Sequence, residues 1–410
     1  MGTRRLNPSP FAHIKVIVTC VRYRIAHAVM KSLSEAGARV IAGDCIDRPI
    51  GRYSNYCDQY FKYSDPFDDP EKFVQAIIAK AKSSGASLIV PTFTETQIIA
   101  RYQDRLLKEG VRMILSPSEL IQYADDKAAI TKHAQKLGLK VPPSWYPKSI
   151  SDVHLLQAEL PYPVIIKSKG GKAGEGQRIV QNSEQLIPAY LDLVDELMPS
   201  EETFPFVQQL VKGMNIGAAF IFFNGRQQAS YSFEVGRTFR RVHSIDRRSV
   251  RHKKAIEDGR CLLEDLNWHG VAQLDYILDA ETGVPYLLEI NPRFWGSVSN
   301  AIEAGVDFPK VLLQLDQGDV SPISRPQKDG IRSIWFYPYL LSASQSLFSG
   351  RFREFYAHLF NPFSSHIRFD DLSISDLKPT LYEPVLGLLN VLRTGGLALD
   401  TRKEKGGPWL

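Results

Sequence analysis

The chain has 410 residues, a formal net charge of +5 at pH 7 and a pI near 8.8. With 44% hydrophobic and 23% charged residues it has the composition of a soluble globular enzyme, and its length predicts two or three domains. A basic balance this mild suits small anionic substrates and gives no reason to expect nucleic acid as a partner. No apolar run reaches the length of about 18 residues that a membrane-spanning helix needs, so we expect no membrane span.

The first residues lack the apolar core of a secretory signal, and the cysteines lack metal-binding spacing. The cysteines are Cys20, Cys45, Cys57 and Cys261. We therefore expect a cytoplasmic protein whose thiols are reduced. The sequence does not decide between a monomer and a homo-oligomer.

Strand and helix patterns alternate over the first part of the chain. The predicted strands are residues 14–19, 39–43, 87–91 and 112–115, with helical patterns between them. This order predicts a small parallel sheet with helices on its faces. The turn after the first strand lacks the glycines that let a pyrophosphate approach, which argues against a dinucleotide-dependent oxidoreductase. Thr92, Thr94 and Glu95 follow a strand's carboxyl end and are candidates for one wall of a substrate site.

Two segments further along carry lysines at strand or helix ends. Asp126 and Lys127 open a helical pattern that Gly138 ends, and on this pattern alone Lys127 would be a surface lysine. Residues 162–180 are typical of a strand, a glycine-rich loop and a second strand, and such a loop lets backbone N–H groups approach phosphate oxygens. Lys167 closes the first apolar run, where a buried ammonium is costly unless an anion meets it.

A basic segment follows at residues 236–252. Arginines near a site that handles phosphate or carboxylate can grip these groups in a bidentate way. We consider Arg237 and Arg241 candidates for substrate contact, with an exposed basic loop as the equal alternative. For Arg247 and Arg248 we expect solvated surface positions.

Two predicted strands then bring carboxylates together. Residues 270–279 alternate like a strand, a turn that Asp279 caps follows, and the next strand ends in Glu289 and Asn291. Glu289 and Asn291 are two residues apart and project from one face, and both offer the hard oxygen ligands that Mg²⁺ accepts. Antiparallel pairing of the strands would bring Asp275 beside Glu289. Arg293 extends the row towards a transferring phosphoryl group.

These motifs and their order resemble the ATP-grasp superfamily, within it the carboxylate–amine ligases with an ATP-grasp domain like that of carbamoyl-phosphate synthase. The family's metal-binding strand reads Glu-x-Asn-Pro-Arg, often followed by Gly-Ser, and this chain has that string from Glu289 to Arg293 with Ser297 shortly after. The resemblance covers about residues 12 to 320 and is most specific between Lys127 and Ser297.

The resemblance implies that the chain binds ATP with Mg²⁺, or with Mn²⁺ in its place. Asp275, Glu289 and Asn291 would hold the metal. Lys127 and Lys167 would meet the nucleotide phosphates. The phosphate-covering loop would contribute Lys169, Gly171, Gly174 and Gly176. Adenine and ribose would lie against Gln208, Gln209, Val211 and Asn215. Family members often carry acidic residues at the places of Gln209 and Asn215, so the chain departs from the pattern there. Arg237, Arg241, Arg293 and Ser297 would bind the substrate, with Arg293 and Lys167 catalytic.

The expected fold is a multidomain α/β and α+β protein. A Rossmann-like domain would span 1–120 and an ATP-grasp domain of two α+β subdomains would span 121–320, with a lid at about 142–210. A helical extension would occupy 321–410. The expected function is a ligase that activates a small-molecule carboxylate as an acyl phosphate and joins it to an amine, releasing ADP and phosphate. Two alternatives stay open: a non-catalytic ATP-binding regulator, and a carboxylase or carbamoyl-phosphate type of ATP-grasp enzyme.

Overall fold

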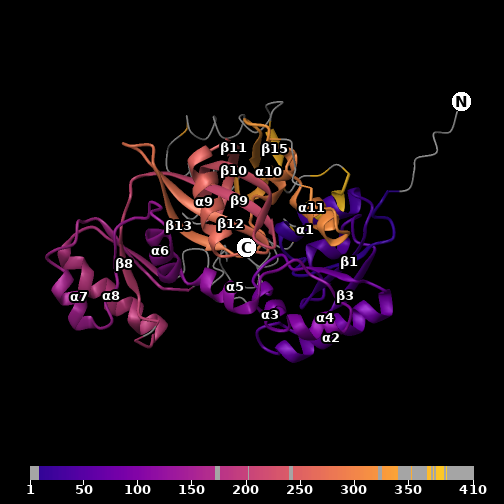
Figure 1. Ribbon diagram of the computed structural model, residues 1–410, viewed down its shortest axis with the longest axis horizontal. Coiled ribbons are helices and arrows are strands. Elements are labelled where there is room, and N and C mark those ends of the chain that lie inside the picture. The colour runs from indigo at the N-terminus through magenta and orange to yellow at the C-terminus, as the bar shows by residue number, and fades with distance from the viewer. Residues whose placement is uncertain are drawn as a thin grey trace, which may run out of the picture.

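The computed structural model describes residues 9–170, 176–201, 203–239, 243–321, 326–339, 352, 367–370, 373, 375–382 and 385. Three sheets organise this part of the chain, and Figure 1 shows how they are arranged. The N-terminal elements lie at the lower right, a lobe that carries α7 and α8 projects to the left, and the largest sheet lies above and between them. No helix in the described ranges has the length and hydropathy to cross a membrane.

The N-terminal sheet is parallel, as predicted. Its strand order is β3-β2-β1-β4, with β1 (Lys15–Val18), β2 (Arg39–Asp44), β3 (Gln59–Lys62) and β4 (Leu88–Val90). Its helical elements are α1 (Arg24–Glu35), a 3₁₀ turn η1 (Ile50–Tyr53), α2 (Pro70–Ser84), α3 (Thr96–Arg101) and α4 (Gln103–Lys108). The chain runs from β1 outward to β2 and later returns to β4 on the other side of β1. The carboxyl ends of β1 and β4 therefore flank a topological switch point, where open α/β sheets bind ligands.

Two details of this sheet differ from the prediction. Strand β3 was not predicted, because its four residues are only half apolar and none is fully buried. The predicted strand at 112–115 is wrong, since only Arg112 forms a bridge, to Leu88 of β4. The chain then leaves the sheet, and the carbonyl of Ile114 passes so close to Gly270 that a β-carbon there would lie 2.6 Å from it. At Ile114 the chain therefore lies against the largest sheet and no longer pairs with β4.

The connecting helices and the small sheet follow. The helices are α5 (Ser118–Asp125) and α6 (Lys127–Lys136), and Asp126 caps α6 by accepting from the backbone N–H of Ala129 at 2.9 Å. The small sheet has the order β5-β8-β6-β7, with β5 (Ser144–Trp145), β6 (Val164–Lys167), β7 (Gln177–Val180) and β8 (Phe206–Gln209). Its helices are α7 (Ile150–Leu156) and α8 (Ser183–Leu197). The two predicted strands on either side of the glycine-rich segment are confirmed by the antiparallel pair β6 and β7.

The largest sheet has seven strands in the order β13-β12-β9-β10-β11-β14-β15. They are β9 (Gly213–Phe223), β10 (Arg226–Phe239), β11 (His243–Ser249), β12 (Gly270–Asp279), β13 (Pro285–Asn291), β14 (Arg332–Ile334) and β15 (Ile367–Phe369). Its helices are α9 (Lys253–Asp265), α10 (Val298–Glu303) and α11 (Phe308–Asp316). Strands β14 and β15 come from the predicted helical extension, a placement that the sequence did not reveal. Most of the predicted helical extension after residue 339 lies outside the described residues. We retain the predicted domain boundaries as a proposal.

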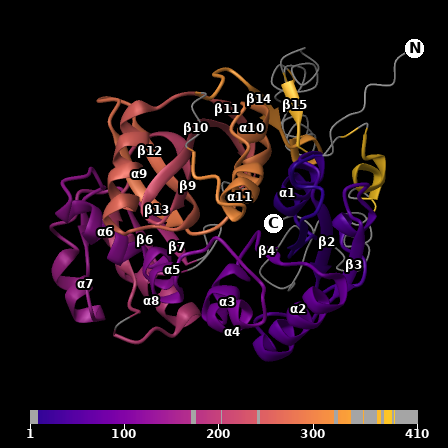
Figure 2. The ribbon, with the colours of Figure 1, turned by 45° about the vertical axis from the view of Figure 1, so that its right-hand side comes forward.

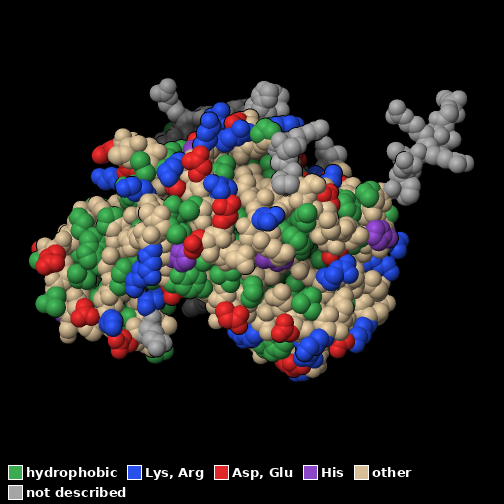
Figure 3. Space-filling model, in the orientation of Figure 1, with side chains coloured by type: hydrophobic (Ala, Val, Ile, Leu, Met, Phe, Trp, Pro, Cys, Tyr) green, Lys and Arg blue, Asp and Glu red, His purple; other side chains and the backbone are tan. Residues whose placement is uncertain are grey.

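Two of the three sheets share hydrophobic cores, and the third has a separate core. Both faces of the N-terminal sheet share continuous apolar clusters with the seven-stranded sheet, and α1 packs beside α10 and α11 (Figure 2). The small sheet with α7 and α8 has a core of its own. Figure 3 shows this part as a lobe set off from the rest of the surface by a notch. The residues that join this lobe to the seven-stranded sheet therefore border a cleft between two separately packed bodies.

The predicted surface position of Arg247 is wrong. It is only 2% exposed, not a solvated surface arginine, and it forms an ion pair with Asp370, which also accepts from Arg24. Its neighbour Arg248 is exposed, as expected. The alternation of β11 points the two side chains to opposite faces, and the C-terminal residues that cover Arg247 carry no sequence signal of this contact.

Replacing Arg247 should cost far more stability than replacing Arg248. Arg247→Met leaves Asp370 buried with one cation fewer, and breaking a buried pair from one side costs about 3 kcal/mol. Arg248→Met, the matched control on the same strand, should change the free energy of unfolding by no more than about 0.5 kcal/mol. Urea denaturation of the two variants tests this. Equal losses would contradict the structural role of the Arg247 pair.

Candidate active site

The hairpin of β12 and β13 brings two carboxylates and an amide together at an edge of the seven-stranded sheet. The strands pair antiparallel with Asp275 opposite Glu289 and Gln273 opposite Asn291, which confirms the predicted pairing. The Asn291 amide donates to Gln273 Oε1 and to Asp275 Oδ2, each at 2.9 Å. Asp279 accepts from the N–H and the hydroxyl of Thr282, each at 2.7 Å, and so holds the turn as predicted. A register shift directly after Asp275 locally re-aims the side chains of this strand.

The two carboxyl groups differ in their electrostatics. Burial, and then the negative charge of Glu289, raise the pKa of Asp275 to about 7. Burial acts in the same direction on Glu289, but the ammonium groups of Lys127 and Lys167 outweigh it and hold the pKa of Glu289 below its usual value. The pair is thus an anionic site that an added cation would stabilise.

Two lysines face this pair from other elements. Lys127, the first residue of α6, places Nζ 3.2 Å from Glu289 Oε2. Lys167, the last residue of β6, donates from Nζ to Gln208 Oε1 at 2.7 Å, and burial lowers the pKa of Lys167 to about 8. The backbone N–H of Lys127 also donates to the carbonyl of Lys169 at 2.9 Å, which ties the start of α6 to the start of the glycine-rich loop. Both lysines are poorly hydrated cations, suited to an anionic ligand.

The expected adenine segment runs from β8 into β9. The Gln208 side chain is buried and engaged with Lys167 and with the Ser144 hydroxyl, and its backbone lies in β8 between β5 and β6. The backbone N–H groups of Gln209 and Leu210 donate to Pro143 and Pro163. Within the described part of the chain, Val211 has no such backbone partner, and Asn215 is exposed on β9 opposite Ile277.

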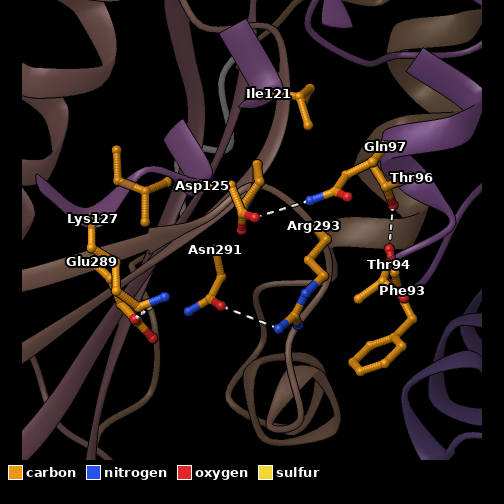
Figure 4. A pocket seen from close by; sticks show the side chains of 12 residues that line it. Phe93, Thr94, Thr96, Gln97, Ile121, Asp125, Lys127, Glu289, Asn291 and Arg293 are labelled. Atoms are coloured by element: carbon orange, nitrogen blue, oxygen red, sulfur yellow. Dashed lines mark hydrogen bonds and ion pairs between the residues drawn. The ribbon is translucent and has the colours of Figure 1, made fainter. Parts of the chain in front are cut away.

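A pocket opens beside the carboxylate pair, between β13, α5 and the segment that follows β4. It is lined by Phe93, Thr94, Thr96, Gln97, Ile121, Asp125, Lys127, Glu289, Ile290, Asn291, Pro292 and Arg293. Figure 4 shows the side chains of Asp125, Asn291 and Arg293 gathered near its centre. The pocket lies at the carboxyl end of β4, by the switch point of the N-terminal sheet. Arg293 donates to Asn291 Oδ1 at 3.2 Å and to the carbonyl of Phe294 at 3.0 Å, and burial lowers its pKa.

Some predicted site residues lie elsewhere or outside the described ranges. Gly171, Gly174 and Arg241 are outside them, and Gly176 turns the loop end with a φ of +66°. Arg237 lies on β10 over the ring of Tyr339, and neither it nor Ser297, buried at the start of α10, lines the pocket.

The N-terminal wall is only partly as predicted. Thr94 lines the pocket, whereas Glu95 turns inward and accepts from the Thr19 hydroxyl at 2.6 Å. Phe93, Gln97 and Asp125 also line the pocket, and no motif in the sequence points to them.

The sequence is similar to known protein families and to known proteins. The family model described as "ATP-grasp in the biosynthetic pathway with Ter operon" matches residues 228–336, and "Carbamoyl-phosphate synthase L chain, ATP binding domain" matches residues 126–211. Biotin carboxylase of Pseudomonas aeruginosa is 22% identical over 330 residues, which are 75% of this chain and 71% of that protein. The carbamoyl phosphate synthase large chain of Mesorhizobium japonicum is 25% identical over 179 residues, 44% of this chain and 15% of that much longer protein.

Solved structures agree on the fold. Biotin carboxylase of Campylobacter jejuni, in a complex with β-γ-ATP, has a TM-score of 0.65 at 18% identity and covers 78% of this chain and 75% of its own. N5-carboxyaminoimidazole synthetase of Staphylococcus aureus with ADP has a TM-score of 0.57 at 18% identity, covering 77% and 79%. The fold is that of a class of α/β proteins in which two α+β subdomains follow a Rossmann-like domain. Two separate stretches of the chain are thus similar to an ATP-grasp family and to the ATP-binding domain of carbamoyl-phosphate synthase.

Divalent cations should stabilise this protein in a pH-dependent way. A cation that binds at Asp275 would have to displace the proton that Asp275 holds below its pKa of about 7, so its affinity should fall up to tenfold per pH unit below that value and level off above it. The rise in melting temperature on adding Mg²⁺ should therefore be clearly larger at pH 8 than at pH 5.5.

The matched control lies on the same hairpin. Glu281→Gln alters an exposed carboxylate in the turn and should leave the Mg²⁺ effect intact, whereas Glu289→Gln should remove most of it. A Mg²⁺ effect that persists in Glu289→Gln would show that the cation binds elsewhere.

Proposed function

We propose that this chain is an ATP-dependent ligase that activates a substrate carboxylate as an acyl phosphate and joins it to an amine. One observation carries the proposal: a directly paired Asp275 and Glu289 face two poorly hydrated lysines from two other elements and border a pocket with an arginine on its wall. Carboxylates for a metal, cations for phosphates and an adjoining pocket with an arginine are the parts that phosphoryl transfer to a carboxylate requires.

Asp275, Glu289 and Asn291 would hold Mg²⁺, with Mn²⁺ as an alternative. The described residues contain no group of three or more His, Cys, Asp or Glu side chains placed for a metal, so the set is two carboxylates and an amide. So small a set of oxygen ligands fits an ion that keeps waters and substrate phosphates in its shell. The raised pKa of Asp275 supports the fit, because a cation would relieve its repulsion from Glu289. When bound, the metal would supply charge neutralisation on the β- and γ-phosphates.

The nucleotide would lie between the lobe of β5 to β8 and the seven-stranded sheet. Lys127 and Lys167 would meet its phosphates, and a metal at Glu289 would free Lys127 from its present ion pair. The glycine-rich loop, with Lys169, Gly171, Gly174 and Gly176, would cover the phosphates. The backbone from Gln208 to Val211 would hold the adenine and Asn215 the ribose. Gln209 and Asn215 replace acidic residues that are frequent in the family, and their amides can still accept hydrogen bonds from hydroxyl or amino groups.

The chemistry follows from this placement. A carboxylate oxygen of the substrate attacks the γ-phosphorus, and the bond to the β,γ-bridging oxygen breaks with its electron pair leaving on ADP. An amine nitrogen then attacks the acyl carbon, the carbon–oxygen bond to phosphate breaks, and the nitrogen loses a proton. Arg293 stabilises the acyl phosphate and the tetrahedral oxyanion, and the remaining contribution of the protein is positioning.

A carboxylase or carbamoyl-phosphate type of reaction is the second candidate. The similarity to biotin carboxylase and to carbamoyl phosphate synthase favours it, and the same ATP site would serve it. ADP release that depends on bicarbonate would identify this reaction, whereas release that needs an organic carboxylate and an amine would identify the ligase. Tight ATP binding without any release would instead favour a regulator.

Glu289→Gln should lower ADP release by about 100-fold or more, because an amide cannot replace the charge of a metal ligand in phosphoryl transfer. Glu281→Gln should release ADP at the wild-type rate. Coupled detection of ADP measures both. Full turnover by Glu289→Gln would remove Glu289 from the mechanism.

ATP affinity should depend on the charge of Lys167. Phosphates favour the ammonium form, so binding takes up a proton whenever Lys167 is neutral in the free protein. Because its pKa is about 8, affinity should fall as the pH rises through that value. Lys167→Arg keeps its charge over the same range and should flatten the profile. Calorimetry between pH 7 and pH 9.5 compares the two proteins. Parallel profiles would contradict the assignment of Lys167 to the phosphates.

A further inference from the structure

Besides the Lys127–Glu289 ion pair, the pocket is lined by one more cation and one more anion, which form no ion pair with each other. Arg293 comes from the loop after β13 and Asp125 from the end of α5. Among the described residues neither takes part in an ion pair within 4.0 Å, although the negative charge of Glu289, and after it that of Asp125, act on the Arg293 guanidinium. Figure 4 shows both side chains reaching into the same space.

Arg293 is held in place by neutral groups only. Its two hydrogen bonds go to the Asn291 amide oxygen and the Phe294 carbonyl, and its guanidinium lies 4.8 Å from the centre of the Phe93 ring. These contacts fix its orientation and leave its charge for a ligand. A carboxylate bound in the pocket would pair with the charge of the Arg293 guanidinium.

The position of Asp125 in α5 does not favour a negative charge. It is the last residue of α5, and a negative charge at a helix C-terminus opposes the helix dipole. Its carboxylate accepts one side-chain hydrogen bond, from the Gln97 amide at 3.0 Å. A neutral asparagine would satisfy that bond equally well, so the charge of Asp125 is available for a cation in the pocket.

We propose that the carboxylate which this chain activates belongs to an amino acid, with its carboxylate at Arg293 and its ammonium group at Asp125. The inference rests on the proposed function, and it names the substrate class of that site. The carboxylate oxygen attacks the γ-phosphorus while the ammonium, kept protonated by Asp125, has no lone pair with which to attack the acyl phosphate. The nitrogen that forms the amide therefore comes from a second molecule. Bicarbonate, which has no cationic group, leaves Asp125 without a role.

Hydroxylamine tests this without knowledge of the second substrate, because it traps an acyl phosphate as a hydroxamate and releases phosphate. The wild-type protein is assayed with Mg-ATP, hydroxylamine and a panel of α-, β- and γ-amino acids, each beside its des-amino analogue. At least one amino acid should give a kcat/KM tenfold or more above that of its analogue. Asp125→Asn should reduce this ratio of the two kcat/KM values to below threefold, mainly by raising the KM for the amino acid.

Asp104→Asn, the same change at an exposed residue of α4, is the control and should keep the wild-type ratio. Melting temperatures verify that both variants are folded. Hydroxamate formation only from des-amino acids, ADP release only with bicarbonate, or a ratio unchanged by Asp125→Asn would overturn the inference and leave the proposed ATP chemistry standing. No ADP release with any carboxylate or with bicarbonate would contradict the proposed function itself, and the inference with it.

Discussion

The antiparallel register of β12 and β13 sets the charge arrangement on which the candidate site depends. It places Asp275 directly opposite Glu289, and two half-buried carboxylates at that spacing repel each other. The structure balances this repulsion with Lys127 from α6 and Lys167 from the small sheet, so that three separate parts of the fold contribute to one electrostatic cluster. A shift of one residue in this register would turn one of the carboxylates to the opposite face and remove the reason for the lysines to meet there.

The cluster of carboxylates and lysines lies where two separately packed parts of the molecule meet. The N-terminal sheet and the seven-stranded sheet share their apolar packing, whereas the small sheet packs only with its own helices. Lys167 therefore belongs to one body, and Lys127 with the carboxylates belongs to the border of the other. An anion that binds both lysines would connect the two bodies, which is how a ligand closes a cleft of this kind. Arg293 and Asp125 lie on the side of the larger body, next to the switch point of the parallel sheet.

Local signals made much of this arrangement predictable. Alternating apolar residues and a capped turn defined the β12–β13 hairpin, and the Asp126 cap defined the start of α6. The sequence could not place Asp125 in the pocket, because that position depends on how α5 packs against β13. It likewise could not bury Arg247, whose partner Asp370 lies 123 residues away along the chain. Both failures concern contacts between distant segments, where no periodicity or spacing in the sequence reports which surfaces meet.

The measurement that tests the central claim most directly is a crystal structure of the chain with Mg²⁺ and a non-hydrolysable ATP analogue. The account predicts a metal bonded to oxygens of Asp275, Glu289 and Asn291. It also predicts phosphate oxygens within hydrogen-bonding distance of the Lys127 and Lys167 ammonium groups, with Lys127 moved away from Glu289. A nucleotide bound at another place, or a metal that avoids the β12–β13 carboxylates, would contradict it.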